Sequence, residues 1–328
     1  MTMQKKAQKF CDDLKISLPI IAGAMYPCSN PELVAAVSEA GGIGIVQPLS
    51  LTYVHGHDFR AGLRYIRSLT SKPIGVNLLV EQSSQKYLER IQAWLTIALE
   101  EDVHFFITAL GNPRFVVEQV HARGGLVYHN TTNLKWAGKA IDAGVDGMIC
   151  VNDRAGGHAG TESAAKLFND LSGLGLPLVC AGGISEPQAL ADMIKLGYAG
   201  VQMGTRFIAS NECSAHPDYK QAILEAGEDQ IVLTEKLSGV PVSVIENDFI
   251  KQNGTRAGVL GRFFLKGVRT KKYMRMYYSL RSFRTLKGDS AKAGIYHHYL
   301  QAGKSVQGVN EVKPVSEIMA EYQKVLIA

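Results

Sequence analysis

The sequence predicts an α/β fold, a closed (β/α)8 barrel of the TIM type with a helical insertion over the barrel mouth. Short apolar runs alternate with helix-like runs eight times between residues 18 and 203. Most of these runs are apolar along their whole length, which is typical of parallel strands covered on both faces. The length of 328 residues suits one such barrel with added segments.

The elements follow from local signals along the chain. Asn30 is the predicted N-cap of a helix that begins at Pro31 and ends before Gly41. Thr161 is the predicted cap of the helix that follows the sixth strand. The predicted strands lie at 18–23, 43–46, 74–79, 104–108, 125–128, 146–151, 176–181 and 200–203, with further helices at 31–40, 59–69, 85–101 and 133–143 and from 113, 161 and 187.

The periodic pattern stops after about residue 233, which suggests three parts. We expect a barrel over 1–238, a basic helical insertion or substrate lid over 239–298, and a segment over 299–328 that returns to the barrel. The net charge is +5, yet residues 249–288 contain eleven Lys or Arg and no Asp or Glu. This segment is either a solvated surface or an entrance that attracts an anionic substrate.

Composition excludes several classes of protein. Hydrophobic residues make up 46% and charged residues 20%, as in soluble globular domains. No apolar stretch is long enough to cross a membrane, and the start has no apolar segment typical of a secretory signal. The five cysteines are odd in number and include no C-x-x-C pair, so we expect a reduced, cytoplasmic setting without disulfides or a metal site.

The chemistry of such a barrel lies at the carboxyl ends of its strands. After the sixth strand, a glycine-rich turn containing Gly156 presents His158, the side chain best suited to move a proton near neutral pH. A tight turn with a surface histidine is the simpler alternative. Asn77 ends the third strand, where it could bond a heteroaromatic ring edge or cap a turn.

Glycine-rich turns also follow the seventh and eighth strands, the usual place for a phosphate site in this fold. The segments 181–184 and 203–207 contribute Gly182, Gly183, Gly204 and Thr205. Backbone N–H groups at a helix start bind anions through unpaired donors. Gly-Gly turns are common, so either segment alone could be an ordinary turn. The occurrence of both segments after the seventh and eighth strands favours the phosphate site.

Together these motifs resemble the nitronate monooxygenase (2-nitropropane dioxygenase) family of FMN barrels. The related FMN-dependent enoyl-ACP reductases and NADH:quinone reductases share the same plan. The likeness extends from about Pro19 to Ser238 and reappears in the glycine motif Gln301–Ser305. The segments that carry it are Ala22–Met25, Gly75–Asn77, Ala155–Gly160, Ala181–Ile184 and Val201–Phe207.

The resemblance implies FMN as the cofactor and His158 as the catalytic base. It implies a phosphate site at Gly182, Gly183, Gly204 and Thr205 and ring contacts from Gly23, Ala24, Met25, Asn77 and Gly156. Asn130 stands near the flavin, at the approximate place of a lysine in some relatives. A second departure is Asn152-Asp153-Arg154, where relatives often show a glycine and a glutamate.

Three functions compete at this stage. The first is oxidation of alkyl nitronates, or another small anion, with O2. The second is NAD(P)H-dependent reduction of an enoyl thioester or a quinone on the same barrel. The third is a flavin-binding protein without robust catalysis, tied to nucleic acid or a membrane by the basic segment, although we expect neither nucleic-acid binding nor stable membrane insertion. An IMP dehydrogenase type is disfavoured because residues 152–160 contain no cysteine.

The sequence is compatible with a homodimer and does not fix the oligomeric state.

Overall fold

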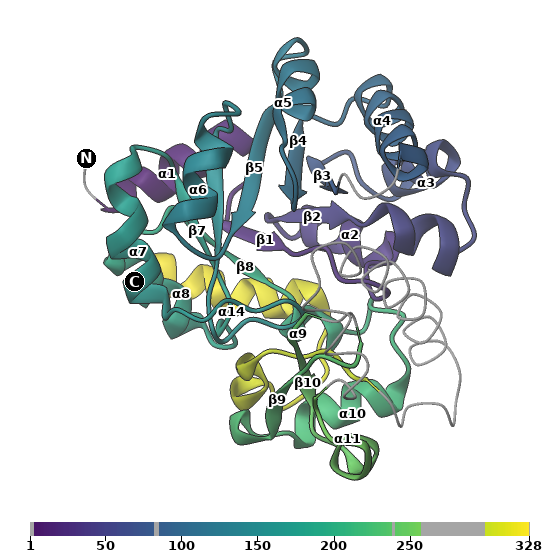
Figure 1. Cartoon of the computed structure of the whole chain (residues 1–328), viewed down its shortest axis with the longest axis vertical. Helices are drawn as coiled ribbons and strands as arrows, with labels where there is room; N and C mark the ends of the chain where they lie inside the picture. The colour runs from purple at the N-terminus through teal and green to yellow at the C-terminus, as the bar shows by residue number, and fades with distance from the viewer. Residues whose placement is uncertain (1–2, 82–84, 238–239, 257–298, 328) are drawn as a thin grey trace.

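The computed structural model describes residues 3–81, 85–237, 240–256 and 299–327, and in it the predicted barrel is confirmed (Figure 1). Eight parallel strands close in chain order, and β1 pairs with both β2 and β8. The strands are β1 (Ile20–Ala22), β2 (Ile43–Val46), β3 (Ile74–Leu79), β4 (Phe105–Ala109), β5 (Leu126–Thr131), β6 (Gly147–Val151), β7 (Leu178–Ala181) and β8 (Gly200–Met203).

Helices surround the barrel and pack on the outward side chains of the strands. The long helices are α1 (Met3–Leu14), α2 (Pro31–Glu39), α3 (Phe59–Leu69), α4 (Gln85–Glu100), α5 (Arg114–His121), α6 (Leu134–Ile141), α7 (Ala164–Leu171), α8 (Pro187–Leu196), α10 (Pro217–Glu225) and α14 (Val315–Ile327). Shorter turns are η1 (Ser50–Val54), η2 (Ser172–Leu174), α9 (Thr205–Ile208), η3 (Glu228–Gln230), α11 (Asp248–Asn253) and η4 (Lys304–Gly308). Within the described residues, no helix is long and apolar enough to span a bilayer.

Two apolar layers follow from the alternation of side chains along each strand. One residue set, including Ile20, Val76 and Val127, packs against the helices. The other set, including Ile21 and Ile149, fills the inside of the barrel. The whole-length apolar strands that predicted the fold therefore supply both layers.

The amino end of the barrel is closed by α1, a helix that the predicted elements did not include. Phe10 is 1% exposed and, with Leu14, belongs to the cluster inside the barrel. The Phe10 ring lies 6.0 Å from the ring of Tyr128. A side chain at Gly200 would come within 2.9 Å of Phe10, so glycine makes room for this plug.

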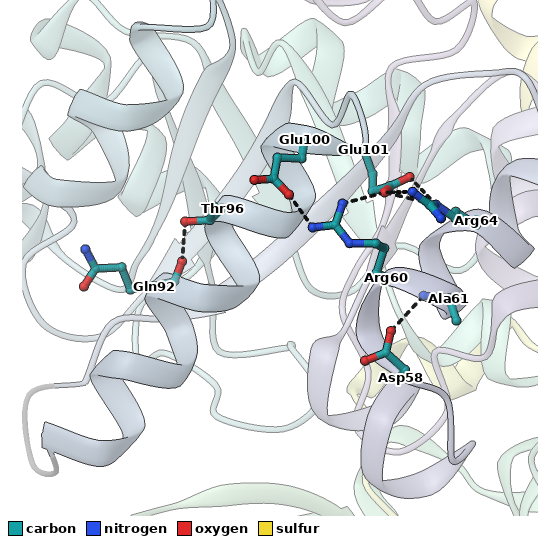
Figure 2. Close-up of polar contacts among 8 residues, drawn as sticks. All are labelled: Asp58, Arg60, Ala61, Arg64, Gln92, Thr96, Glu100 and Glu101. Carbon is teal, nitrogen blue, oxygen red and sulfur yellow. Dashed lines mark hydrogen bonds and ion pairs between the residues drawn. The ribbon is translucent and has the colours of Figure 1, made fainter.

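Polar contacts tie α3 to α4 on the barrel surface (Figure 2). Arg60 Nη1 and Arg64 Nη2 lie 2.8 and 2.9 Å from Glu101 Oε1. The hydrogen bonds from Arg64 and Arg60 lower the pKa of the Glu101 carboxyl. Asp58 caps α3 by accepting a hydrogen bond from the Ala61 N–H at 3.1 Å. Such exposed pairs orient neighbouring helices but contribute little to stability.

Two predicted helix caps differ in the structure. Ser163, not Thr161, caps α7 by accepting a hydrogen bond from the Lys166 N–H at 3.3 Å. Asn30 occupies the N-cap position of α2, but its side chain makes no capping bond. Its Oδ1 accepts from the Ser214 N–H at 3.0 Å, so a distant loop has recruited the local capping residue.

An additional unit lies at the carboxyl side of the barrel, next to α9 (Figure 1). It contains two antiparallel strands, β9 (Ile231–Thr234) and β10 (Val242–Ile245). β10 is a strand where the sequence pattern suggested a helix, because all four of its residues are buried and pair with β9. The sheet has a strand on each side of the predicted boundary at 238. The lid expected over 239–298 lies mostly outside the described residues, so the three-part division stays a prediction.

Candidate active site

Asn152 organises the loop that carries His158, a role the sequence reasoning missed. Its Nδ2 donates to the Gly182 carbonyl at 3.0 Å, and its Oδ1 accepts from the Arg154 N–H at 2.8 Å. Its carbonyl accepts from the Gly160 N–H at 3.0 Å. Asn152 is 1% exposed. One buried amide thus links the β6 loop to the β7 loop. The signal that could have predicted this role is the position of Asn152 directly after a strand.

The β7 turn requires glycine for two reasons. Gly182 has φ +118° and Gly183 has φ +80°, a region that side chains rarely adopt. A Cβ on Gly182 would lie 2.2 Å from Asn152 Oδ1 and 2.6 Å from the Ala155 nitrogen. The two predicted loops therefore lie in direct contact, and a bare backbone is needed between them.

The β8 turn lies against the C-terminal segment. Thr205 Oγ1 accepts a hydrogen bond from the Gly303 N–H at 3.0 Å. A Cβ on Gly303 would come within 2.6 Å of the Gly156 nitrogen, so this segment also packs on the His158 loop. Gly303, in the glycine motif at 301–305, therefore lies against the turns after β6 and β8.

Backbone donors are available at the two turns. Within the described residues, the N–H groups of Gly182, Gly183 and Thr205 donate no hydrogen bond to the protein. α9 has only four residues, so an anion here would depend on individual amides more than on a helix dipole. The guanidinium of Arg206 is directed elsewhere and donates to the carbonyls of Ala209 and Glu311.

Three amide side chains enter the barrel interior near its carboxyl end. Asn77 shares its strand face with Gly75, whose added Cβ would touch Ile45 inside the barrel at 2.6 Å. Asn130 shares its face with Tyr128, which belongs to the same interior cluster. Asn130 lies within β5, although the sequence placed it in the loop after the strand.

Gln202 is the third of these amides, and the sequence reasoning missed it. Its side chain lies 3.1 Å from the position of a Cβ on Gly23. The oxygens Gln202 Oε1 and Asn130 Oδ1 are buried and have no hydrogen-bond partner among the described residues. The sequence signal for Gln202 was a polar residue in an otherwise apolar strand. Burying an unpaired polar atom is costly, so such a residue indicates a binding role.

The β1 loop joins the same end of the barrel. The Met25 sulfur lies 3.4 Å from the position of a Cβ on Gly204, so the loops after β1 and β8 are adjacent. Ala24 packs on the interior cluster. The Met25 N–H donates to Ser29 Oγ at 2.8 Å, which fixes this loop.

His158 is exposed on the β6 loop and lies close to the additional unit. Its neighbour Gly157 has φ +68° and accepts a hydrogen bond from the Ser243 N–H at 2.7 Å. β10 therefore makes a second contact with the loop that Asn152 organises. Gly156 is exposed and would meet Gly303 N at 2.9 Å if it carried a Cβ.

The cysteines are packing residues in this structure. All five are buried and free, and Cys150 pairs in register with Cys180 between β6 and β7. Burial raises the pKa of the Cys180 thiol to about 12. Among the described residues, no group of three or more His, Cys, Asp or Glu could hold a metal ion.

The arrangement fits a flat cofactor with an anionic tail. Free amide donors and bare glycines at the β7 and β8 turns would accept a phosphate. The unpaired oxygens of Asn130 and Gln202 would accept N–H donors from a ring. The donors lie in the turns after β7 and β8, and the unpaired oxygens lie in β5 and β8, at the same end of the barrel as the loop that carries His158.

Comparison with known proteins identifies the class as a flavin-dependent oxidoreductase built on a (β/α)8 barrel. Residues 8–323 match the sequence profile of the family described as nitronate monooxygenase, and the chain belongs to this family. This confirms the resemblance found in the sequence motifs.

Individual relatives agree with the assignment. A protein of Staphylococcus saprophyticus, named probable nitronate monooxygenase, is 31% identical over 280 residues, covering 72% of this chain and 78% of that protein. A Mycobacterium tuberculosis protein, named as an octahydro-indene carboxyl-CoA dehydrogenase, is 28% identical and covers 74% of this chain and 67% of its own length.

Solved structures show the same fold over nearly all of the chain. FabK from Thermotoga maritima is 28% identical, with a TM-score of 0.78 and coverage of 97% of this chain and 96% of that chain. Nitroalkane oxidase from Streptomyces ansochromogenes has the same TM-score at 23% identity, covering 97% and 98%, and supports the fold alone.

Proposed function

We propose that the protein oxidises alkyl nitronates with O2 on a bound FMN. The observation that carries this proposal is the contact between the glycine turn of β7 and the His158 loop, in a chain that belongs to the nitronate monooxygenase family. The contact would bring an anion site and a proton-transfer residue to one end of the barrel.

The chain's own residues would hold the cofactor in two zones. Gly182, Gly183, Gly204 and Thr205 would bind the phosphate, and the ring zone comprises Gly23, Ala24, Met25, Asn77, Asn130 and Gly156. When bound, FMN would supply electron-acceptor chemistry and reactivity toward O2. The protein would supply donors for the phosphate, acceptors for the ring and the apolar side chains of the barrel interior.

His158 would act as the general base. A neutral nitroalkane must lose the proton α to its nitro group before oxidation, and imidazole Nε2 or Nδ1 takes such a proton near neutral pH. A preformed nitronate has already lost this proton. The role of His158 therefore depends on which form of the substrate is supplied.

The test compares the two substrate forms in His158→Ala. We expect the variant to retain FMN and to lose roughly 10²–10⁴-fold in kcat/KM on a neutral nitroalkane. The loss on the preformed nitronate should be smaller. Wild-type rates on the neutral substrate would reject the base and restore the interpretation of His158 as a surface turn residue.

A second candidate is reduction or dehydrogenation of a thioester, with NAD(P)H as the electron donor in the reductive case. It is favoured by the Mycobacterium tuberculosis relative, whose name specifies a carboxyl-CoA substrate. Anaerobic mixing with NADH separates the reductase from the oxidase. Prompt bleaching of the flavin supports the reductase, and a stable flavin spectrum rules out the reductive case.

A further inference from the structure

Arg154 lies directly against the glycine turn proposed to bind phosphate. Its Cδ and Nε are each 3.0 Å from the position of a Cβ on Gly183. Its backbone is held on both sides, because its N–H donates to Asn152 Oδ1 at 2.8 Å and its carbonyl accepts from the Lys304 N–H at 2.9 Å. The stem of the side chain is therefore directed across the turn.

The charges around this turn favour an anion. The Arg154 guanidinium forms an ion pair with Glu228, and the two side chains are 41% and 45% exposed. The hydrogen bond and charge of Arg154, together with the charge of Lys304, lower the pKa of the Glu228 carboxyl. Two cations thus face one carboxylate, and the guanidinium has five donors, more than one carboxylate can use.

We propose that Arg154 recognises the phosphate of the flavin and makes the site selective for FMN over neutral riboflavin. The inference rests on the proposed function and assigns a binding role to a residue of the segment Asn152-Asp153-Arg154, which departs from the pattern of the family. A guanidinium matches phosphate geometry. It would donate a charge-assisted hydrogen bond to the phosphate, beside the hydrogen bonds donated by the N–H groups of Gly182 and Gly183. Glu228 orients the guanidinium from the other side and competes with the phosphate for it.

The experiment measures the dissociation constants of FMN and riboflavin with the full chain, freed of flavin and titrated by fluorescence quenching. Arg154→Gln should weaken FMN binding about tenfold, the scale of one partly exposed charged hydrogen bond. Riboflavin binding should stay within about twofold, because the neutral ligand has no phosphate to lose. Arg154→Lys should keep part of the FMN preference.

Glu228→Gln is the matched control, since it removes the same ion pair but keeps the cation. We expect it to bind FMN as tightly as the wild type or more tightly. The inference is wrong if Arg154→Gln keeps the wild-type affinity for FMN. It is also wrong if Arg154→Gln and Glu228→Gln each weaken the binding of FMN and riboflavin equally, because Arg154 would then have only a structural role. A wild-type protein that binds neither flavin overturns the proposed function and this inference with it.

Discussion

The two ends of the barrel interior are built from different side chains. At the amino end, Phe10, Phe105 and Tyr128 pack ring against ring, with centroids 5.2 to 6.0 Å apart in the two Tyr128 contacts. At the carboxyl end, Asn130 and Gln202 bury oxygens that find no partner among the described residues. The amino end is therefore optimised for packing. The carboxyl end contains unpaired oxygens that cost stability, and a ligand that donates hydrogen bonds to them would remove this cost.

Two consecutive residues of β5 show the same contrast. His129 faces the outer layer and is 5% exposed, with Nδ1 2.9 Å from Thr108 Oγ1. Asn130 faces the interior, and its Oδ1 has no partner among the described residues. Because strand side chains alternate, one residue step separates a paired structural group from an unpaired group open to a ligand.

The largest expected effect on flavin binding comes from Gly182→Ala, which would close the anion site. The new Cβ would lie 2.2 Å from Asn152 Oδ1 at a φ of +118°, so the β6 and β7 loops must separate. We expect flavin affinity to fall about a hundredfold, measured by flavin titration. Gly124→Ala is the control, because it has φ +69° but no atom within 4 Å. Equal losses in both variants would contradict a specific anion site.

A substitution at the amino end of the barrel should change the stability of the protein and leave flavin binding unchanged. Phe10→Ala removes a ring that is 1% exposed, and we expect the free energy of unfolding to fall by about 3–5 kcal/mol in denaturant titrations. Flavin bound per folded molecule should not change. Leu69→Ala, at a residue that is 41% exposed, is the control and should cost little. A loss of flavin from the folded Phe10 variant would show that the two ends are not separable.

His129 predicts a pH dependence of stability. Burial lowers its pKa to about 4, whereas an unfolded histidine titrates near 6.5. As pH falls below about 6.5 the unfolded chain takes up the proton first, so roughly 3 kcal/mol is lost by about pH 4. The His129→Gln variant should lose less stability than the wild type between pH 7 and pH 5 in urea titrations. Identical profiles would refute this cause.

Asn130→Leu should produce the smallest change and separate stability from binding. Removing the unpaired oxygen should raise the free energy of unfolding of the flavin-free protein by about 1 kcal/mol and weaken flavin binding about tenfold. Asn152→Leu is the matched control, since this buried amide is fully engaged and its loss should destabilise the protein. Destabilisation of the flavin-free Asn130 variant would mean that its oxygen is already satisfied.

The barrel was predictable because its strands are short, apolar and separated by clear turn signals. β2, β3 and β8 coincide with the predicted ranges. α1 was missed although Ala7, Phe10, Cys11 and Leu14 are buried at helical spacing, a pattern that predicts a helix. What the local pattern does not reveal is that the Phe10 ring enters the amino end of the barrel. β10 was taken as helical because four buried residues carry no period of their own, and only pairing with β9 makes them a strand.

The turns of the candidate site were predictable where glycine must be present, and the contacts of its polar side chains were less so. Gly182, Gly183 and Gly156 lie where the motifs placed them, in contact with the neighbouring loops. Asn152 and Gln202 escaped because their roles arise from contacts across strands. Asn30 shows the same limit, since tertiary partners outcompete the local cap.

The most direct test of the central claim is the identity of the cofactor in the purified full-length protein. The claim is that the carboxyl end of the barrel, with its amide donors and unpaired acceptors, holds FMN. We expect a yellow protein with a flavin absorption spectrum, and extraction should release FMN in a ratio close to one per chain. A colourless protein that does not take up added FMN, or one that releases FAD, would contradict the account.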